Sequence, residues 1–212
     1  NHFDQLNPNT DLVIIAISDQ SIADVIQKIN HYLQQALIVH TSGSTSLEVL
    51  STVHERSGVF YPLQTFSHER AIDWAETPMF VEAVRHNDLE LLASLAHSLT
   101  PKVYQYSSQQ RQTLHMAAVF ACNFSNYCYD LSKQIVDEQQ VDFSLLYPLI
   151  LETAQKATIN NPKEMQTGPA MRGDENILKM HQQLLEKNSG SDLVDVYKLL
   201  SEGIMKRHLH GK

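Results

Sequence analysis

The front half of the chain alternates continuous apolar runs with segments of helical periodicity. Residues 12–17 form an unbroken, β-branched run, and residues 36–40 form a second one. Between them, Ile22, Val25, Ile26 and Ile29 recur at spacings of three and four, which predicts one buried face of a helix over residues 22–32. Strand, helix, strand in this order predicts a βαβ unit whose strands are buried on both faces of a parallel sheet.

Four further segments continue this pattern before the periodicity changes. Residues 58–66 are expected to form a short strand that runs into a loop, residues 78–83 another strand, and leucines at helical spacing predict a helix over residues 87–98. Residues 102–106 alternate polar and large apolar side chains, which is typical of a half-exposed edge strand. The fold class predicted for this half is therefore α/β.

From residue 107 onward the apolar positions keep a period near 3.6. A long helix is expected from an N-cap at Ser107 or Ser108 to about Asp137. Shorter helices are expected over residues 143–158, 175–186 and 192–208. We therefore divide the chain into an α/β domain over residues 1–106 and an all-α domain over residues 107–212.

Composition and charge exclude several classes of protein. Hydrophobic residues make up 42% and charged residues 19% of the 212 residues, as in an ordinary globular chain. The 16 basic residues against 24 acidic ones leave a net charge of −8, which opposes binding to nucleic acids and to anionic membranes. No apolar run approaches the roughly 18 residues that a membrane span needs. We therefore expect neither a nucleic-acid nor a membrane partner.

The cysteines, glycines and histidines limit which disulfide, nucleotide and metal sites we expect. Cys122 and Cys128 lie about 120° apart on one predicted helix, so they cannot easily form a bridge, and reduced thiols in a cytoplasmic protein are expected. The seven glycines form neither a G-x-G-x-x-G nor a Walker loop, so no phosphate loop predicts nucleotide binding. The eleven histidines show no metal-ligand spacing, and we expect no metal site.

Four motifs carry a resemblance to a known family. They occur in order along the chain, as Val39–Ser44, Val59–Ser67, His115–Asn123 and Gln166–Asp174. They resemble the uncharacterised family that joins a Rossmann-like NAD(P)-binding domain to a helical domain of unknown function. This family is similar to the deazaflavin-dependent NADP reductases, ketopantoate reductases and pyrroline-carboxylate reductases.

The resemblance implies a fold and an activity. The expected fold is a Rossmann-like front part followed by an all-α dimerisation domain of the 6-phosphogluconate-dehydrogenase C-terminal type. The expected cofactor is NADP or NAD, and the expected reaction is hydride transfer between the nicotinamide and a small carbonyl, imine or hydroxy acid. A homodimer through the helical domain is expected, and the small residues near Ala117 favour close helix packing there. A second hypothesis is a non-catalytic ligand-binding or regulatory dimer that kept this fold.

One departure from the family concerns the start of the sequence. Family members begin with a strand, a glycine-rich turn and a helix before the segment that here starts at Asn1. We expect the sequence to be a fragment whose pyrophosphate-binding part lies upstream. The alternative is a protein that lacks this half of the cofactor site, which would favour the non-catalytic hypothesis.

Small polar residues follow the first two predicted strands. Ser18 and Asp19 come after the first strand, and Thr41, Ser42 and Gly43 come after the second. Open α/β sheets bind ligands at the carboxyl ends of their strands. Together with the resemblance, this position predicts that the five residues line the cofactor. Simple helix capping is the alternative reading.

His115 carries the sharpest chemistry, because an imidazole exchanges protons near neutral pH. The related ketopantoate-reductase pattern has a lysine followed at i+4 and i+8 by asparagines that line the substrate site. His115 stands at the lysine position and Asn123 at the second asparagine, whereas Val119 departs from the first. The resemblance thus implies proton transfer by His115 and substrate contact by Asn123. Asn126, 20° from His115 on the helical wheel, is an alternative, and a purely structural histidine is another.

Three more residues are candidates for binding the substrate. Gln64 and Thr65 follow Pro62 in a loop after a strand and could orient a small polar molecule, although a plain structural loop explains them equally. Arg172 could clamp a substrate carboxylate, in a site shared between subunits. A salt bridge from Arg172 to Asp174, or a dimer contact, is the alternative.

Overall fold

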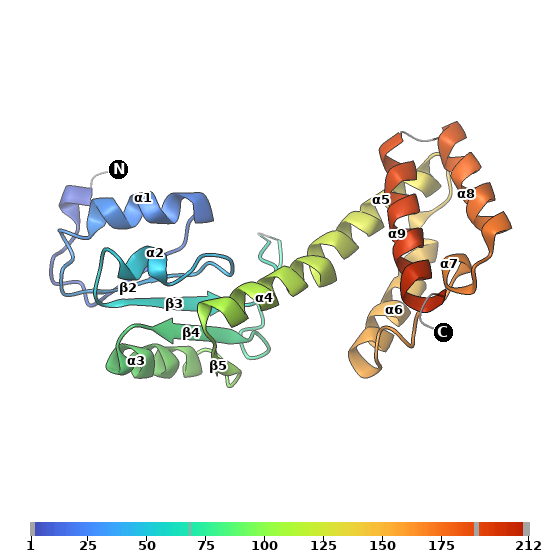
Figure 1. Cartoon of the computed structure of the whole chain (residues 1–212). Helices are drawn as coiled ribbons and strands as arrows, with labels where there is room; N and C mark the ends of the chain where they lie inside the picture. Colours follow the sequence, from blue (N-terminus) through green and yellow to red (C-terminus); the bar gives the residue numbers. More distant parts are fainter. Residues whose placement is uncertain (1–2, 68, 189–190, 210–212) are drawn as a thin grey trace. The chain divides into compact units, whose positions relative to one another are not determined.

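A computed structural model describes residues 3–67, 69–188 and 191–209. The chain forms two compact units, residues 1–124 and residues 125–212, which are described separately (Figure 1). The first unit holds the sheet, and the second is helical, as the sequence predicts.

The first unit is built on a five-stranded sheet in the order β1-β2-β3-β4-β5. The strands are β1 (Leu12–Ile15), β2 (Leu37–His40), β3 (Ser57–Pro62), β4 (Met79–Ala83) and β5 (Val103–Gln105). The first three strands run parallel to one another, β4 runs antiparallel to β3, and β5 runs parallel to β4. The 3₁₀ turn η1 (Phe3–Gln5) precedes the sheet, and its connecting helices are α1 (Asp19–Ile29), α2 (Glu48–Ser51) and α3 (His86–His97).

Alternate residues of the strands pack into two separate cores. Ile38 of β2 packs with Ile22 and Ile26 of α1 on one face of the sheet. Its neighbours Leu37 and Val39 point to the other face, where they pack with residues of α3. Figure 1 shows α1 and α3 on opposite sides of the strands. This arrangement confirms the predicted α/β class and the predicted apolar face of α1.

The two edge strands differ in how well the sequence predicted them. Strand β5 lies at the edge, as the alternation over residues 102–106 indicates. Strand β1 lies at the opposite edge, and the side chain of Ile14 is 45% exposed. The prediction that this strand is buried on both faces is therefore wrong for the described residues, since the side chain of Ile14 is open to solvent and only Ile15 is fully buried.

The chain is helical from Ser108 to Asp137, as predicted, but the helix changes type in the middle. It consists of α4 (Ser108–Ala118), the π-helical segment η2 (Val119–Phe124) and α5 (Ser125–Asp137). Ser107 is the N-cap, and it forms a capping box with Gln110. Leu114 of α4 packs against buried side chains of β3 and β4. This contact ties α4 to the sheet.

The second unit continues with five helical segments. They are η3 (Phe143–Leu146), α6 (Tyr147–Ile159), α7 (Pro169–Arg172), α8 (Glu175–Asn188) and α9 (Ser191–Leu209). A small core joins Leu185 of α8 to Leu193 and Val194 of α9. Gly173 ends α7 in the left-handed conformation, with φ at 70°, and this is a conformation that glycine adopts without strain. Among the described helices, none combines the length and the apolar character that crossing a membrane requires.

The first compact unit ends at Phe124, and the second begins at Ser125. Helix α4 therefore packs with the sheet that precedes it. The sequence instead places a domain boundary between residues 106 and 107, where the apolar pattern becomes helical. That boundary stays a prediction.

Candidate functional site

Three parallel strands end at one edge of the sheet, and their following residues surround a cavity of about 490 Å³. Asp19 follows β1, Thr41 and Gly43 follow β2, and Tyr61 lies near the end of β3. The cavity is lined by Ala16, Asp19, Thr41, Ser42, Gly43, Tyr61, Pro62, Gln64, Phe66 and His115. A hollow therefore lies at the carboxyl ends of the strands, where α/β sheets bind their ligands, and its role as a cofactor site stays a prediction.

Ser42 shapes the loop after β2. Its hydroxyl oxygen accepts hydrogen bonds from the backbone N–H groups of Ser44, at 3.2 Å, and Thr45, at 2.9 Å. The hydroxyl of Ser44 donates to the carboxylate of Asp19, which connects this loop to the start of α1. The Ser42 hydroxyl is therefore used within the loop, and what this residue offers to a ligand is its place in the cavity wall.

A buried arginine that sequence reasoning missed holds the same loop. Arg111 of α4 is 1% exposed, and its Nε donates to the carbonyl oxygen of Ser42 at 3.2 Å. Its two terminal nitrogens donate to the carbonyl oxygen of Thr45 and, at 2.7 Å, to Glu82 of β4. Glu82 also accepts from the hydroxyl of Ser108 at 2.8 Å. This network joins the loop, β4 and the start of α4. Neither Arg111 nor Glu82 belongs to a sequence motif. The one signal of this network in the sequence was Glu82, an acidic residue within an otherwise apolar strand.

Tyr61 and His115 form a hydrogen-bonded pair at the inner end of the cavity. The hydroxyl oxygen of Tyr61 and Nδ1 of His115 are 3.2 Å apart. Burial raises the pKa of Tyr61, so its hydroxyl keeps its proton across the neutral range. A tyrosine hydroxyl that contacts an imidazole can pass a proton to or from a ligand. The sequence identified His115 but not its partner.

Gly43 makes room for this pair. A Cβ atom built on Gly43 would lie 2.5 Å from Nδ1 of His115 and 2.8 Å from Cζ of Tyr61. Real Cβ atoms do not approach other atoms so closely. Glycine at this position therefore allows both rings to reach the loop after β2.

A second histidine lies behind the loop, and sequence reasoning also missed it. His40 is fully buried at the end of β2, and its Nδ1 accepts from the backbone N–H of Ser42 at 3.1 Å. Burial, assisted by the positive charge of Arg111, lowers the pKa of His40 from 6.5 to about 4. His40 is therefore neutral at pH 7 and supports the loop rather than carrying a charge.

A second cavity, of about 480 Å³, lies along α4 and η2 and shares a wall with the first. Tyr61, Gln64 and His115 line both cavities. The other lining residues are Leu63, Thr65, Leu114, Ala117, Ala118, Val119, Ala121, Cys122 and Asn123. The π-helical turn carries the last four of them. π-Helical turns occur often at functional sites, because they alter which side chains face a cavity.

The two cavities bring together most of the predicted site residues. His115, Asn123, Gln64 and Thr65 line the second cavity, whereas Asp19 and the residues after β2 line the first. Ser18 lines neither of them; its hydroxyl pairs with that of Ser21 at 3.0 Å.

Two predicted residues belong to the second compact unit. Asn126 and Arg172 are both exposed, and neither lines one of these cavities. The predicted wheel position of Asn126 assumed a regular α-helix, and the π-helical segment between it and His115 changes that angle. Their assignment to the substrate site stays a prediction.

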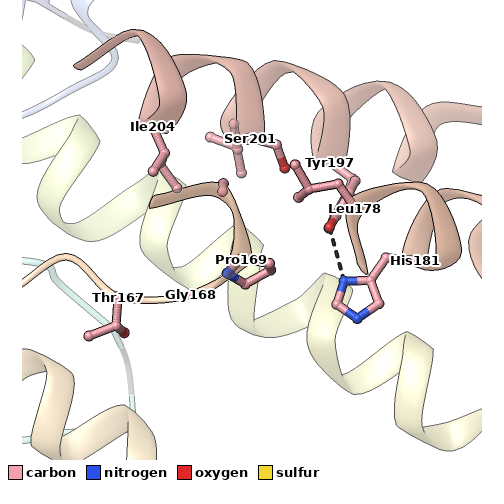
Figure 2. A pocket seen from close by; sticks show the side chains of 10 residues that line it. Thr167, Gly168, Pro169, Leu178, His181, Tyr197, Ser201 and Ile204 are labelled. Atoms are coloured by element: carbon pink, nitrogen blue, oxygen red, sulfur yellow. Dashed lines mark hydrogen bonds between the residues drawn. The ribbon is translucent and has the colours of Figure 1, made fainter. Parts of the chain in front are cut away.

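The motif Gln166–Asp174 lines part of a smaller cavity in the second unit, of about 300 Å³ (Figure 2). Gly168 and Pro169 line it together with His181 of α8 and Tyr197 of α9. Nδ1 of His181 and the Tyr197 hydroxyl are 2.9 Å apart, as the dashed line in Figure 2 marks. Over the described residues, no three histidine, cysteine, aspartate or glutamate side chains could hold a metal ion together, and both cysteines are free.

Comparison with known proteins finds one family model and several solved structures that this chain resembles. The model of a domain of unknown function, DUF2520, matches residues 77–204. No curated protein matches the chain significantly. A solved structure from Bacteroides fragilis, provisionally described as an NADP oxidoreductase, is 38% identical and has a TM-score of 0.89. The match covers 96% of this chain and 78% of that one.

Two more distant structures share the fold. The protein TM1727 from Thermotoga maritima is 23% identical with a TM-score of 0.79, over 96% of this chain and 81% of that one. A reductive aminase from Aspergillus terreus, solved with NADPH and ethyl-5-oxohexanoate, is 12% identical with a TM-score of 0.64. It is matched over 92% of this chain and 74% of that one. These likenesses confirm a Rossmann-like α/β unit followed by a helical region.

Proposed function

The chain belongs to the DUF2520 family, and we propose that it is an NADP-dependent oxidoreductase acting on a small carbonyl, imine or hydroxy-acid compound. The name of the 38% identical Bacteroides fragilis protein supports this assignment. NADP is favoured over NAD because that name and the NADPH-bound reductive aminase both point to the phosphorylated cofactor.

The observation that carries the proposal is the wall shared by the two cavities. Tyr61 and His115 line both the hollow at the strand ends and the hollow along α4. An oxidoreductase of this kind needs a cofactor and a substrate side by side, with a proton donor where they meet. The hydrogen-bonded pair occupies such a position.

The residues of the first cavity fit part of a nicotinamide cofactor. Gly43 has no side chain, so the rings of Tyr61 and His115 lie against the backbone after β2 and line the cavity beside it. Thr41 and Asp19 add a hydroxyl and a carboxylate that can bind ribose hydroxyls. The cavity volume of about 490 Å³ lies in the range of ligand sites. A bound nicotinamide supplies the hydride in such reactions.

The chain's own residues then have separate tasks. The Tyr61 hydroxyl donates a proton to the carbonyl oxygen or imine nitrogen during reduction, and Nδ1 of His115 returns one to Tyr61. Gln64, Thr65 and Asn123 orient the substrate by hydrogen bonds from the wall of the second cavity. Arg111 keeps the loop after β2 in place without touching the reacting atoms.

We also propose that the protein is a homodimer built on its helical unit. Large apolar side chains remain well exposed there, among them Leu149 at 62% and Leu199 at 71%. Exposed apolar surface of this kind marks interaction sites. We further propose that the protein acts in the cytoplasm, a reducing compartment in which the two free thiols would stay reduced.

Binding of NADPH to the full-length protein, followed by nicotinamide fluorescence, tests the proposal. We expect micromolar binding and, with a carbonyl or imine substrate, oxidation of NADPH. Tyr61→Phe and His115→Gln should each lower kcat by about 10²-fold or more, with NADPH binding kept, as expected for lost acid–base chemistry.

The second hypothesis, a non-catalytic binding dimer, predicts a different result. A protein that binds NADPH but oxidises it with none of a broad set of carbonyls and imines would support that hypothesis. A protein that binds neither NADPH nor NADH would overturn the oxidoreductase proposal.

A further inference from the structure

The wall of the second cavity holds no lysine or arginine among its described lining residues. Seven of those residues are aliphatic or a thiol: Leu63, Leu114, Ala117, Ala118, Val119, Ala121 and Cys122. The remaining five carry polar groups that can form hydrogen bonds: Tyr61, Gln64, Thr65, His115 and Asn123. A ligand in this cavity therefore meets mostly hydrocarbon and a few hydrogen-bonding groups.

The nearest buried cation cannot serve a ligand. Arg111 is 1% exposed, and its guanidinium already donates to two backbone carbonyls and to Glu82. The described residues lining the two cavities include no lysine or arginine, and their one acidic side chain, Asp19, lines only the first cavity. A carboxylate on a substrate in the second cavity would lose hydration and meet no lysine or arginine among the described lining residues. Burying an unpaired charge in this way is strongly unfavourable.

The polar groups in the wall of the second cavity suit a ligand with one uncharged hydrogen-bond acceptor. The Tyr61 hydroxyl can donate, and Oε1 of Gln64 already accepts from the backbone N–H of Thr65 at 2.8 Å. Gln64 therefore offers a ligand its amide N–H groups. A single carbonyl oxygen or imine nitrogen beside an apolar body matches this set of donors.

We infer that the substrate of the proposed reductase is an uncharged, largely apolar ketone or imine that carries no carboxylate. The inference rests on the proposed function and narrows it, since it removes 2-oxo acids and hydroxy acids from the expected substrates. It also removes the carboxylate clamp that the sequence assigned to Arg172.

A matched pair of substrates tests this inference. In 4-methylpentan-2-one and 4-methyl-2-oxopentanoate the same alkyl group and ketone carry either a methyl group or a carboxylate. We expect kcat/KM with NADPH to be at least tenfold higher for the neutral ketone at pH 8, where imidazoles are mostly uncharged. Saturation-transfer NMR without cofactor should show the same preference in binding. Equal or better use of the oxo acid would overturn the inference.

Substitutions in the wall give a sharper readout. Ala118→Arg adds a cation to the cavity and should shift the ratio of acid to ketone kcat/KM by at least tenfold towards the acid. Ala118→Met adds similar length without charge and should leave that ratio unchanged. If Arg172→Ala lowers turnover of the oxo acid selectively, Arg172 binds the carboxylate and the inference is wrong.

The proposed function and the substrate class fail in different ways. Absence of NADPH binding contradicts the proposed function, and the NMR comparison of the two ligands still decides the character of the cavity. NADPH binding together with a preference for the oxo acid contradicts only the substrate class.

Discussion

The backbone of Gly43 lies directly against the imidazole of His115, so that an added Cβ atom would be 2.5 Å from Nδ1. Gly43→Ala should therefore displace the ring and break its hydrogen bond with Tyr61. Displacement of a reacting group by about 1 Å can cost about 10²-fold in rate. We expect kcat to fall by at least tenfold, measured as NADPH oxidation.

Gly203 provides the matched control for this substitution. It lies in α9, and a Cβ atom built there would meet nothing within 4 Å. Gly203→Ala should leave activity unchanged and raise the free energy of unfolding by about 0.5–1 kcal/mol, because alanine favours the helix. Full activity of Gly43→Ala would show that the close contact does not matter for the chemistry.

Removal of the buried arginine should destabilise the first unit. Arg111→Met leaves Glu82 without its cation and two backbone carbonyls without a donor. Breaking a buried ion pair by removing one partner costs about 3 kcal/mol or more. Urea unfolding at pH 7 measures this loss.

An exposed ion pair offers the comparison. Arg85 pairs with Glu55, and both side chains are largely open to solvent, at 44% and 77%. Arg85→Met should change the free energy of unfolding by less than about 1 kcal/mol. Equal effects of the two substitutions would mean that the Arg111 network contributes nothing special.

The low pKa of His40 predicts that stability falls in mild acid. The unfolded chain takes up a proton on this imidazole near pH 6.5, whereas the folded chain does so only near pH 4. Between these values the unfolded state binds more protons, so the free energy of unfolding decreases as the pH falls. The contribution from His40 is present above pH 6.5, and about 2 kcal/mol of it is lost between pH 7 and pH 5.

Unfolding of His40→Asn at pH 7 and pH 5 checks this expectation. The asparagine oxygen can still accept the hydrogen bond from Ser42, and the loss between the two pH values should shrink by about 2 kcal/mol. His97→Asn, at an exposed histidine, should keep the wild-type dependence. An unchanged dependence in His40→Asn would assign the acid sensitivity to other groups.

The proposed dimer predicts a solution mass of twice the chain mass. Leu149→Glu and Leu199→Glu each place a charge on exposed apolar surface of the helical unit, and at least one of them should give a monomer. Light scattering after size exclusion measures the mass. A wild-type protein that is monomeric at micromolar concentration would contradict the proposal.

The sequence predicted the elements that local pattern determines. The spacing of Ile22, Ile26 and Ile29 identified α1, the alternation around Tyr104 identified an edge strand, and Ser107 identified the start of α4. These signals are short in range, because helix caps and apolar faces depend on neighbouring residues. The sequence also singled out His115, Gly43 and Asn123 by their residue types and positions after a strand or on a helix; they line the two cavities, and their roles stay predictions.

The sequence pattern did not predict contacts between residues that lie far apart in the chain. Tyr61 and His115 are 54 positions apart, and their hydrogen bond depends on α4 packing across β3. The network of Arg111 joins residues 66 and 69 positions away in the chain. The π-helical segment was missed as well, since its apolar pattern does not differ from that of an α-helix over six residues.

The reversal of β4 has a consequence for how this family can diversify. Because β4 runs antiparallel to β3, the segment between them leaves the sheet and returns to it on the ligand side. A hydrogen bond of 2.9 Å from the N–H of Leu63 to the carbonyl of Pro78 closes the base of this segment. Residues can be inserted or exchanged above that closure without shifting the strand register. Evolution, or a protein engineer, can therefore vary this hairpin to change ligand preference while the scaffold stays the same.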